Sequence, residues 1–425
     1  MELRFDVKDC LRIIKQELIE PFVQSKWVPL ITALAALSPQ IGPVPHISYI
    51  HIPLIALCVG MNLGRHWSVE KACVAFLFYL PISIIVSNPD PVFQSWTRMV
   101  LFMFVFILVS PFFKGEYIAN MRRKILIGTL LISSIISIGS FFCYFLGVNY
   151  MKFQGEERGI DVYMGSAGSF GGLSVHSMVL ALFGGIATLW LFYRSQKNKG
   201  DGQWIYWVMM GLSLATVAFS ASRSALLATI AGLLVMLYYI KKENGSFIKS
   251  LLVIVVGAML TFPLWEGALE GVLKKQENNE KSGEQYGSRT RKWESRIEEF
   301  ASSPVFGVGF SAQDPNGKDY YDKKTGTVEP GSSWLCILSM TGAIGFILIL
   351  YIFVSPIPYL QNNPIPYNGM LLGLMTFFFM SFVSEGYIYA GGNGMCFVAW
   401  LVFGCANDVK EGFIEDDIDS DDEDD

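Results

Sequence analysis

The feature that most constrains the fold of this chain is a series of long apolar runs that carry no charge. The chain is 52% hydrophobic and only 16% charged, which is far more apolar than a soluble protein of 425 residues needs. A run of about 20 apolar residues can cross a bilayer as a helix, because a helix satisfies its backbone hydrogen bonds internally. The sequence therefore predicts an all-α, polytopic membrane protein.

Twelve segments have the composition of membrane spans. Pro29, Pro39 and Pro43 interrupt the first one, which makes it the weakest. Ahead of it, residues 1–26 form an amphipathic stretch of mixed charge that we expect on the membrane surface. The predicted spans are 27–42, 46–64, 68–87, 97–113, 124–147, 173–193, 204–220, 223–240, 248–266, 333–354, 367–384 and 389–405.

Lysine and arginine set the predicted orientation, since cytoplasmic loops are enriched in both. Basic loops alternate with short loops that contain neither residue, at 43–45, 88–96, 221–222 and 385–388. We therefore expect the basic loops and both termini in the cytoplasm, and one large loop outside.

Three regions follow from this topology. Residues 1–26 form a cytoplasmic amphipathic segment, 27–405 a transmembrane domain with the outer loop 267–332, and 406–425 an acidic cytoplasmic tail. The tail ends in Glu415 to Asp425, where nine of eleven residues are acidic, so it is too charged to fold alone.

Arg223 stands alone between two apolar spans, in the small-residue segment Ser220-Ala221-Ser222-Arg223-Ser224. An arginine at the bilayer centre costs about 2.5–3.5 kcal/mol, so a chain retains one near hydrocarbon for a partner or a task. The small neighbours allow a ligand to come close. A guanidinium in this setting favours an anionic ligand, and phosphate is the usual one.

The outer loop holds a second candidate anion site. A helix is predicted from the cap residue Ser288 to the residues before Pro304. Its apolar side chains recur at helical spacing and are expected to form the inward stripe, which consists of Trp293, Ile297 and Phe300. Arg289 and Arg296 border that stripe, whereas Arg291 points the other way. The alternative is a solvated amphipathic helix that lies on the membrane.

Four segments of the chain form an ordered set of motifs. They are Ser220-Ala221-Ser222-Arg223; Arg289-x-x-x-Trp293 followed by Pro304-x-x-Gly307-x-Gly309; Trp334-Leu335-x-x-Leu338-x-x-x-Gly342-x-x-Gly345; and Glu385-Gly386-Tyr387. Their order and spacing resemble the O-antigen polymerase/ligase family of bacterial membrane glycosyltransferases. In the second motif, Pro304 to Phe310 predicts a tight turn in which glycines allow close backbone approach.

The resemblance implies a C-type glycosyltransferase fold in the bacterial inner membrane, with an active site that faces outside. Such enzymes transfer a glycan from undecaprenyl diphosphate to an acceptor hydroxyl, without a nucleotide sugar, a metal or another cofactor. The arginines that match the family's motifs, Arg223 and Arg289, would grip the diphosphate. This role suits guanidinium, which binds phosphate bidentately and stabilises a charged leaving group.

The chain departs from the family's ligases at one position. Those enzymes usually place a histidine shortly before the Leu-x-x-Leu segment, where this chain has Gly331-Ser332-Ser333-Trp334. The resemblance therefore implies a polymerase, which joins lipid-linked repeat units, and leaves the general base open. Glu385 is the candidate base, because it ends a span beside aromatic residues. Its alternative role is that of an ion-pair partner of Arg223 or Arg289.

Further candidate substrate contacts are Arg158, His176, Arg291, Arg296 and Tyr387. Arg158 has the alternative of a solvated loop charge, and His176 that of a hydrogen-bonded residue near the membrane interface. Asp90 in Asn88-Pro89-Asp90-Pro91 is expected to form a turn.

Other chemistries lack a signal in the sequence. There is no phosphate-binding loop, dinucleotide fingerprint or zinc spacing, and the seven cysteines are expected to be free thiols. No basic and aromatic surface suggests nucleic acid. The expected partners are an undecaprenyl-diphosphate-linked oligosaccharide, membrane lipid, and a chain-length regulator or flippase of the same pathway. The alternatives to a polymerase are a ligase and a transporter of lipid-linked oligosaccharides, although the two halves show no repeat.

Overall fold

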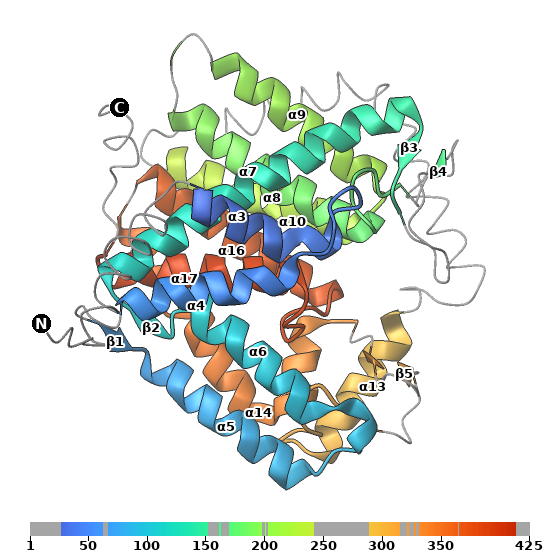
Figure 1. Ribbon diagram of the computed structural model, residues 1–425, viewed down its shortest axis with the longest axis vertical. Helices are drawn as coiled ribbons and strands as arrows, with labels where there is room; N and C mark the ends of the chain where they lie inside the picture. Colours follow the sequence, from blue (N-terminus) through green and yellow to red (C-terminus); the bar gives the residue numbers. More distant parts are fainter. Residues whose placement is uncertain are drawn as a thin grey trace, which may run out of the picture.

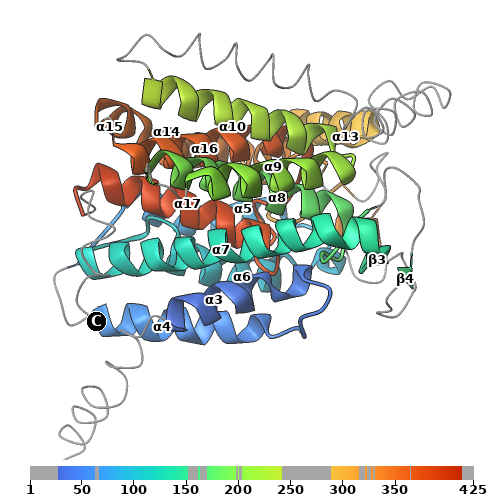
Figure 2. The same cartoon turned by 90° about the horizontal axis from the view of Figure 1, so that it is seen from above.

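The computed structural model describes residues 27–62, 67–151, 161–162, 170–197, 200, 203–241, 289–314, 321–322, 327–328, 331–363 and 365–413. Most helices run side by side along one direction and form a bundle (Figures 1 and 2). The helices are α3 (Trp27–Leu37), α4 (His51–Asn62), α5 (Lys71–Ser87), α6 (Ser95–Val109), α7 (Glu116–Leu146), α8 (Ser177–Lys197), α9 (Gln203–Phe219), α10 (Arg223–Lys241), α13 (Arg289–Ser302), α14 (Ser333–Val354), α15 (Ile357–Asn362), α16 (Pro366–Ser384) and α17 (Gly394–Lys410).

Short elements connect the helices. Three antiparallel pairs of two-residue strands are β1 (Ser68–Val69) with β2 (Phe113–Lys114), β3 (Val148–Asn149) with β4 (Asp161–Val162), and β5 (Tyr321–Asp322) with β6 (Thr327–Val328). Single 3-10 turns are η2 (Ser38–Gln40), η3 (Ser48–Ile50) and η4 (Pro91–Phe93). Asp90 caps η4 by accepting from the backbone N–H of Val92 at 2.9 Å, as the turn prediction requires.

Every predicted span that falls on described residues contains a helix, and the span predicted at 248–266 lies outside them. Five helical stretches are long and apolar enough to cross a membrane, judged by length and composition: Pro91–Val109, Glu116–Leu146, Ser177–Lys197, Ser333–Asn362 and Pro366–Ser384. Large apolar side chains also cover the outside of the bundle, such as Phe78 and Ile85 on α5. A helical membrane protein is therefore confirmed, whereas twelve spans and cytoplasmic termini stay predictions. The amphipathic segment 1–26 and the end of the acidic tail lie outside the described residues.

Aromatic side chains hold the middle of the bundle together. Trp400 of α17 is fully buried and packs edge to face on Phe106 of α6, with ring centroids 4.7 Å apart. Phe353 of α14 stacks on Phe403 at 3.8 Å. The five cysteines whose side chains the structure describes are free thiols, as predicted: Cys73, Cys143, Cys336, Cys396 and Cys405.

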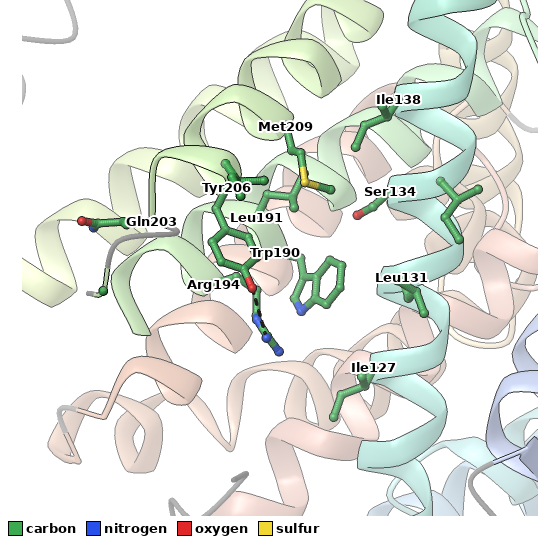
Figure 3. A pocket seen from close by; sticks show the side chains of 13 residues that line it. Ile127, Leu131, Ser134, Ile138, Trp190, Leu191, Arg194, Gln203, Tyr206 and Met209 are labelled. Carbon is green, nitrogen blue, oxygen red and sulfur yellow. Dashed lines mark hydrogen bonds between the residues drawn. The ribbon is translucent and has the colours of Figure 1, made fainter. Parts of the chain in front are cut away.

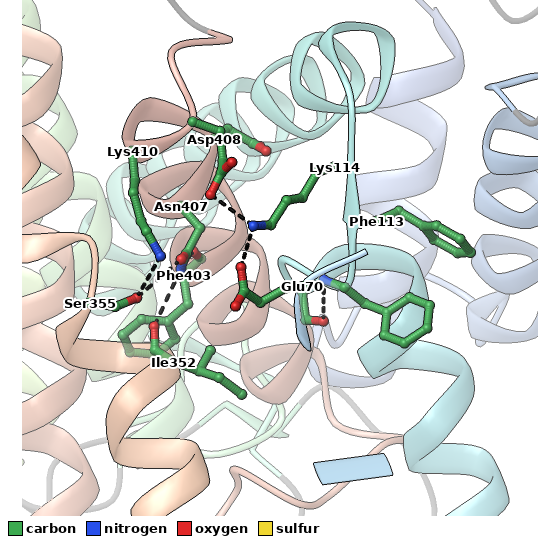
Figure 4. Close-up of polar contacts among 12 residues, drawn as sticks. Glu70, Phe113, Lys114, Ile352, Ser355, Phe403, Asn407, Asp408 and Lys410 are labelled. Atoms are coloured by element: carbon green, nitrogen blue, oxygen red, sulfur yellow. Dashed lines mark hydrogen bonds and ion pairs between the residues drawn. The ribbon is translucent and has the colours of Figure 1, made fainter. Parts of the chain in front are cut away.

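One end of the bundle is fastened by charged side chains, among them Lys114 beside Glu70 (Figure 4). Arg122 of α7 is completely buried, and its Nε donates to Asp408 of α17 at 2.7 Å. Its Nη1 also donates to the carbonyls of Ser110 and Phe113, both at 3.0 Å. A buried ion pair is tolerated when such hydrogen bonds satisfy its remaining groups. This pair therefore fixes where α7 and α17 meet.

A groove between α7, α8 and α9 opens on the side of the bundle (Figure 3). Its walls are mostly apolar, and its volume is about 900 Å³. Arg194 lies at one end of the groove, where its Nη2 donates to the hydroxyl of Tyr206 at 3.4 Å.

The end of the bundle opposite to Arg122 and Asp408 is called the site end. Helix α16 ends there, and α8, α10 and α14 begin there. Figures 1 and 2 show α13 and β3 at this end.

Two glycines from different motifs contact the same segments at the site end. Gly342 (φ 62°) kinks α14, and a Cβ on it would overlap the backbone of Val305. Gly307 (φ 74°) has no room either, because its Cβ would lie 2.5 Å from the carbonyl carbon of Met340. The predicted close approach of the turn at 304–310 is thereby confirmed.

Candidate active site

An ion pair between Arg289 and Glu385 forms the centre of the site end. Arg289 is the first residue of α13, and its Nη2 donates to Glu385 Oε1 at 2.8 Å. Its Nη1 donates to the carbonyl of Gly331 at 3.2 Å, and the indole of Trp293 donates to the same carbonyl at 3.3 Å. The side chains are 26% and 14% exposed, respectively, so the pair is partly desolvated yet open to a ligand. Of the two roles left open for Glu385, the structure shows the ion pair with Arg289.

The backbone of Glu385 is fixed by the start of α14. Its carbonyl accepts from the backbone N–H of Ser333 at 2.9 Å and from the Ser333 hydroxyl at 2.6 Å. The neighbouring Ser332 caps α14 and donates from its hydroxyl to the carbonyl of Phe382 at 3.0 Å. The two serines thus join the beginning of α14 to the end of α16. The segment that replaces the ligase histidine has this structural role.

The start of α8 adds a third element beside Arg289. The Arg289 Nη2 group lies 3.4 Å from the sulfur of Met178. His176 precedes α8, and its Nδ1 accepts from the backbone N–H of Met178 at 3.2 Å. The predicted contact His176 therefore lies close to Arg289 in the fold, where its side chain caps the start of α8.

Arg223 begins α10 at the same end of the bundle. The residue before its cap, Ala221, has a left-handed backbone (φ 51°), which costs on the order of 1 kcal/mol without a glycine. This turn separates α9 from α10 and lets Ser222 accept the first helical hydrogen bond from Leu226 at 3.0 Å. A strained residue of this kind is typical of positions that aim a functional side chain.

The packing of α10 against α16 places Arg223 level with Glu385. A Cβ on Gly232 of α10 would lie 2.8 Å from the carbonyl oxygen of Gly373 of α16, which fixes the register of the two helices. Arg223 lies roughly 14 Å and Glu385 about 18 Å from this crossing point toward the site end, at 1.5 Å per residue. The structure therefore brings all three predicted catalytic residues to one end of the bundle.

The predicted inward face of α13 is wrong. Ile297 is 55% exposed, whereas Ser295, Arg296 and Glu299 are buried against the bundle. The Nη1 of Arg296 lies 3.0 Å from Glu299 Oε2, and this mutual neutralisation lets two charges replace the apolar stripe. Burial raises the pKa of Glu299, and the positive charge of Arg296 opposes that shift.

The other predicted substrate contacts have different surroundings. Arg291 is exposed, as its predicted position opposite the apolar stripe required. Arg296 is fully buried, and Tyr387 is buried with its hydroxyl 2.8 Å from Ser381 Oγ. Burial raises the pKa of Tyr387, so its phenol stays neutral. This geometry favours structural roles for Arg296 and Tyr387. Arg158 lies outside the described residues.

Arg98 is a cation that the sequence interpretation overlooked. It lies in the first turn of α6 and lines a cavity of about 380 Å³ beside the segment 386–393, next to Glu385. Its Nη1 donates to the hydroxyl of Ser311 at 3.4 Å. The signal was present, because Arg98, like Arg223, is a lone arginine at the start of an apolar span.

Within the described ranges, His, Cys, Asp and Glu side chains form no group of three that could hold a metal ion. Independence of a metal stays a prediction. The chemistry that the site end offers directly is cationic binding of an anion, with one carboxylate beside it.

Comparison with known families agrees with the motifs. Residues 208–350 match the model of a family described as O-antigen ligase. This range covers roughly a third of the chain and includes Arg223, Arg289 and the start of α14, but ends before Glu385. The resemblance to the O-antigen polymerase/ligase family is thereby confirmed, and it implies glycan transfer from a lipid-linked glycan. No curated protein matches the chain.

Proposed function

We propose that this protein is a polymerase that joins undecaprenyl-diphosphate-linked repeat units into O-antigen, capsule or exopolysaccharide. The observation that supports this most is the site end itself, where Arg289 pairs with Glu385 and Arg223 begins the neighbouring helix. We place this end at the outer face of the bacterial inner membrane, because the predicted basic loops lie at the opposite end.

In this proposal the two arginines hold the donor diphosphate. The guanidiniums of Arg223 and Arg289 are permanently charged and present planar forks of N–H groups, which match phosphate oxygens. As the bond from the anomeric carbon to the diphosphate breaks, negative charge grows on the leaving oxygen. Cations already in place stabilise that charge without reorganisation.

Glu385 is placed to accept the proton in the same step. The acceptor hydroxyl oxygen forms the new bond to the anomeric carbon, and its proton passes to a carboxylate oxygen of Glu385. Undecaprenyl diphosphate leaves, and Glu385 later gives that proton to the diphosphate or to water, which restores the base. The ion pair seen here holds the carboxylate beside the cation that binds the donor, so both roles of Glu385 are compatible.

The serines at the start of α14 favour a polymerase over a ligase, because no histidine occupies that position. The ligase stays the second candidate, since the matched family is described as O-antigen ligase. One assay separates them, with purified protein and a lipid-linked repeat unit extracted from cells that lack the protein. A ladder of products from this unit alone supports the polymerase. Transfer only after a lipid A-type acceptor is added means a ligase, and no transfer at all favours a transporter.

A further inference from the structure

The cavity beside Glu385 has one charged wall. Of the described residues that line it, Arg98 is the only charged one, and the rest are small, apolar or neutral polar side chains. Its volume of about 380 Å³ lies near the lower end of the range for ligand sites, roughly 300–1,000 Å³. This size suits a single sugar ring better than a long glycan.

Strained backbone frames Arg98. Gln94, just before α6, has φ 49°, and Ser311, which accepts from Arg98, has φ 57°. Non-glycine residues adopt this conformation at a cost of about 1–3 kcal/mol and cluster at ligand clamps. The backbone N–H of Arg98 donates to the carbonyl of Gln94 at 3.0 Å and its guanidinium donates to Ser311, so both strained residues contact Arg98.

The cavity adjoins the proposed donor site. Its wall includes Gly386, the residue after Glu385, and Cys336 of α14. The carboxylate of Glu385 is bonded to Arg289, at the position proposed for the donor diphosphate. A ligand in the cavity and a diphosphate on Arg289 would therefore both lie next to the segment Glu385-Gly386.

We propose that this cavity binds the terminal sugar of the acceptor glycan, with Arg98 donating to its hydroxyl or carboxylate oxygens. The inference rests on the proposed function, since a glycan transferase must hold an acceptor beside its donor. The acceptor oxygen must come within about 3–3.5 Å of the anomeric carbon. A cavity lining with one arginine among neutral described residues suits a sugar, whereas a diphosphate favours two cations, Arg223 and Arg289.

The test separates sugar binding from diphosphate binding in the full-length protein. One probe is the oligosaccharide of a single repeat unit, released from its lipid by mild acid, and the other is undecaprenyl diphosphate without sugar. Arg98→Ala should weaken oligosaccharide binding at least about tenfold and change undecaprenyl diphosphate binding less than about twofold. Arg289→Ala should give the reverse pattern.

A second variant changes the cavity lining without replacing Arg98. Gly392 lines the cavity, and a Cβ added there meets nothing within 4 Å, so Gly392→Leu fits the fold and adds a bulky side chain to the cavity lining. Gly211 on α9 is equally open and lies away from the cavity, which makes Gly211→Leu the matched control. Only Gly392→Leu should weaken oligosaccharide binding.

Three results would overturn the acceptor site: no oligosaccharide binding by the wild type, full binding by Gly392→Leu, or equal loss of both probes in Arg98→Ala. The ladder assay keeps this outcome apart from that of the polymerase. Oligosaccharide binding through Arg98 without a ladder supports the cavity and rejects the polymerase. A ladder with unchanged binding in both cavity variants rejects the cavity alone.

Discussion

Replacing Glu385 with glutamine tests the chemistry of the site most directly. The substitution removes the charge and the basic oxygen but keeps the shape and an oxygen that can accept from Arg289. A hydrogen bond between charged groups contributes about 1.5–3 kcal/mol, and the amide should retain part of it. The hydrogen bonds that the backbone carbonyl of Glu385 accepts from Ser333 do not involve the Glu385 side chain. We therefore expect Glu385→Gln to lose about 1 kcal/mol of unfolding free energy.

The substitution Glu385→Gln should reduce the rate of glycan transfer far more than it reduces the free energy of unfolding. Loss of a general base slows a reaction by about 10²–10⁴-fold, so we expect at least a hundredfold slower transfer. Binding of the lipid-linked donor should stay within about threefold, since Arg223 and Arg289 remain. Single-turnover transfer measured at saturating donor separates the two quantities.

Glu411→Gln is the matched control, because Glu411 also accepts a 2.8 Å hydrogen bond from a cation, Lys114, but at the opposite end of the bundle. It should leave the transfer rate unchanged. If Glu385→Gln loses donor binding in proportion to its rate, Glu385 acts only through Arg289. The same conclusion holds if Arg289→Ala and Glu385→Gln are strongly non-additive in binding. The departing diphosphate would then supply most of the driving force without a strong protein base.

The remaining predictions concern the arginines, metal and the glycine contact. Arg223→Ala should abolish transfer in a folded protein, and Arg223→Lys should recover little because lysine lacks the planar fork; polymer of normal length from the alanine variant would contradict this. Arg289→Ala should reduce the transfer rate much more than Arg291→Ala, since Arg291 is exposed and Arg289 pairs with Glu385; equal rates would show that the wrong face was chosen. Excess chelator should leave the ladder assay unchanged, and activity restored by Mg²⁺ would refute that. Gly342→Ala should destabilise the fold by about 2–3 kcal/mol in thermal or denaturant unfolding, because its Cβ overlaps Val305; unchanged stability would mean that the kink relaxes.

The helices followed from the sequence because long apolar runs are a local property. Their ends did not, as α7 shows. Its span was predicted from residue 124, yet the helix begins at Glu116 and includes Arg122. The charge of Arg122 suggested a loop, whereas its partner Asp408 lies 286 residues away and allows it to be buried. Such long-range pairing leaves no local signal.

Helix α13 is a second case in which the local sequence predicted a helix but not its packing. Its existence followed from the cap and the proline, but its face did not, because the stripe argument assumes that apolar residues point inward. Arg296 and Glu299 are one helical turn apart and neutralise each other, so the charged face can be buried. The spacing of Arg296 and Glu299 is compatible with an ion pair. The local sequence, however, does not indicate that this pair faces the bundle in preference to Trp293, Ile297 and Phe300.

The candidate site was predictable in its members and not in its geometry. Arg223, Arg289 and Glu385 were identified one at a time, from a lone charge, a helix start and a span end. Their placement at one end of the bundle depends on α16 packing against both α10 and the start of α14, which no motif encodes. Arg98 carried the same signal as Arg223, a single arginine at the start of an apolar span, but its cavity could not be predicted because Ser311 and Gly386 come from distant segments.

The serines at the start of α14 connect the departure from the ligase pattern with the position of Glu385. A histidine at this point would offer a base from α14 itself. Here Ser332 and Ser333 use their hydroxyls to hold the last turn of α16 and the carbonyl of Glu385. The carboxylate that follows is thereby placed against Arg289, between the proposed donor site and the cavity of Arg98. In our proposal the general base is Glu385 at the end of α16, in place of a histidine at the start of α14, and Ser332 and Ser333 hold it in position. Ser333→Ala should then slow single-turnover transfer at saturating donor, because the Glu385 carbonyl loses the hydrogen bond from the Ser333 hydroxyl. An unchanged rate would show that the serine does not position Glu385.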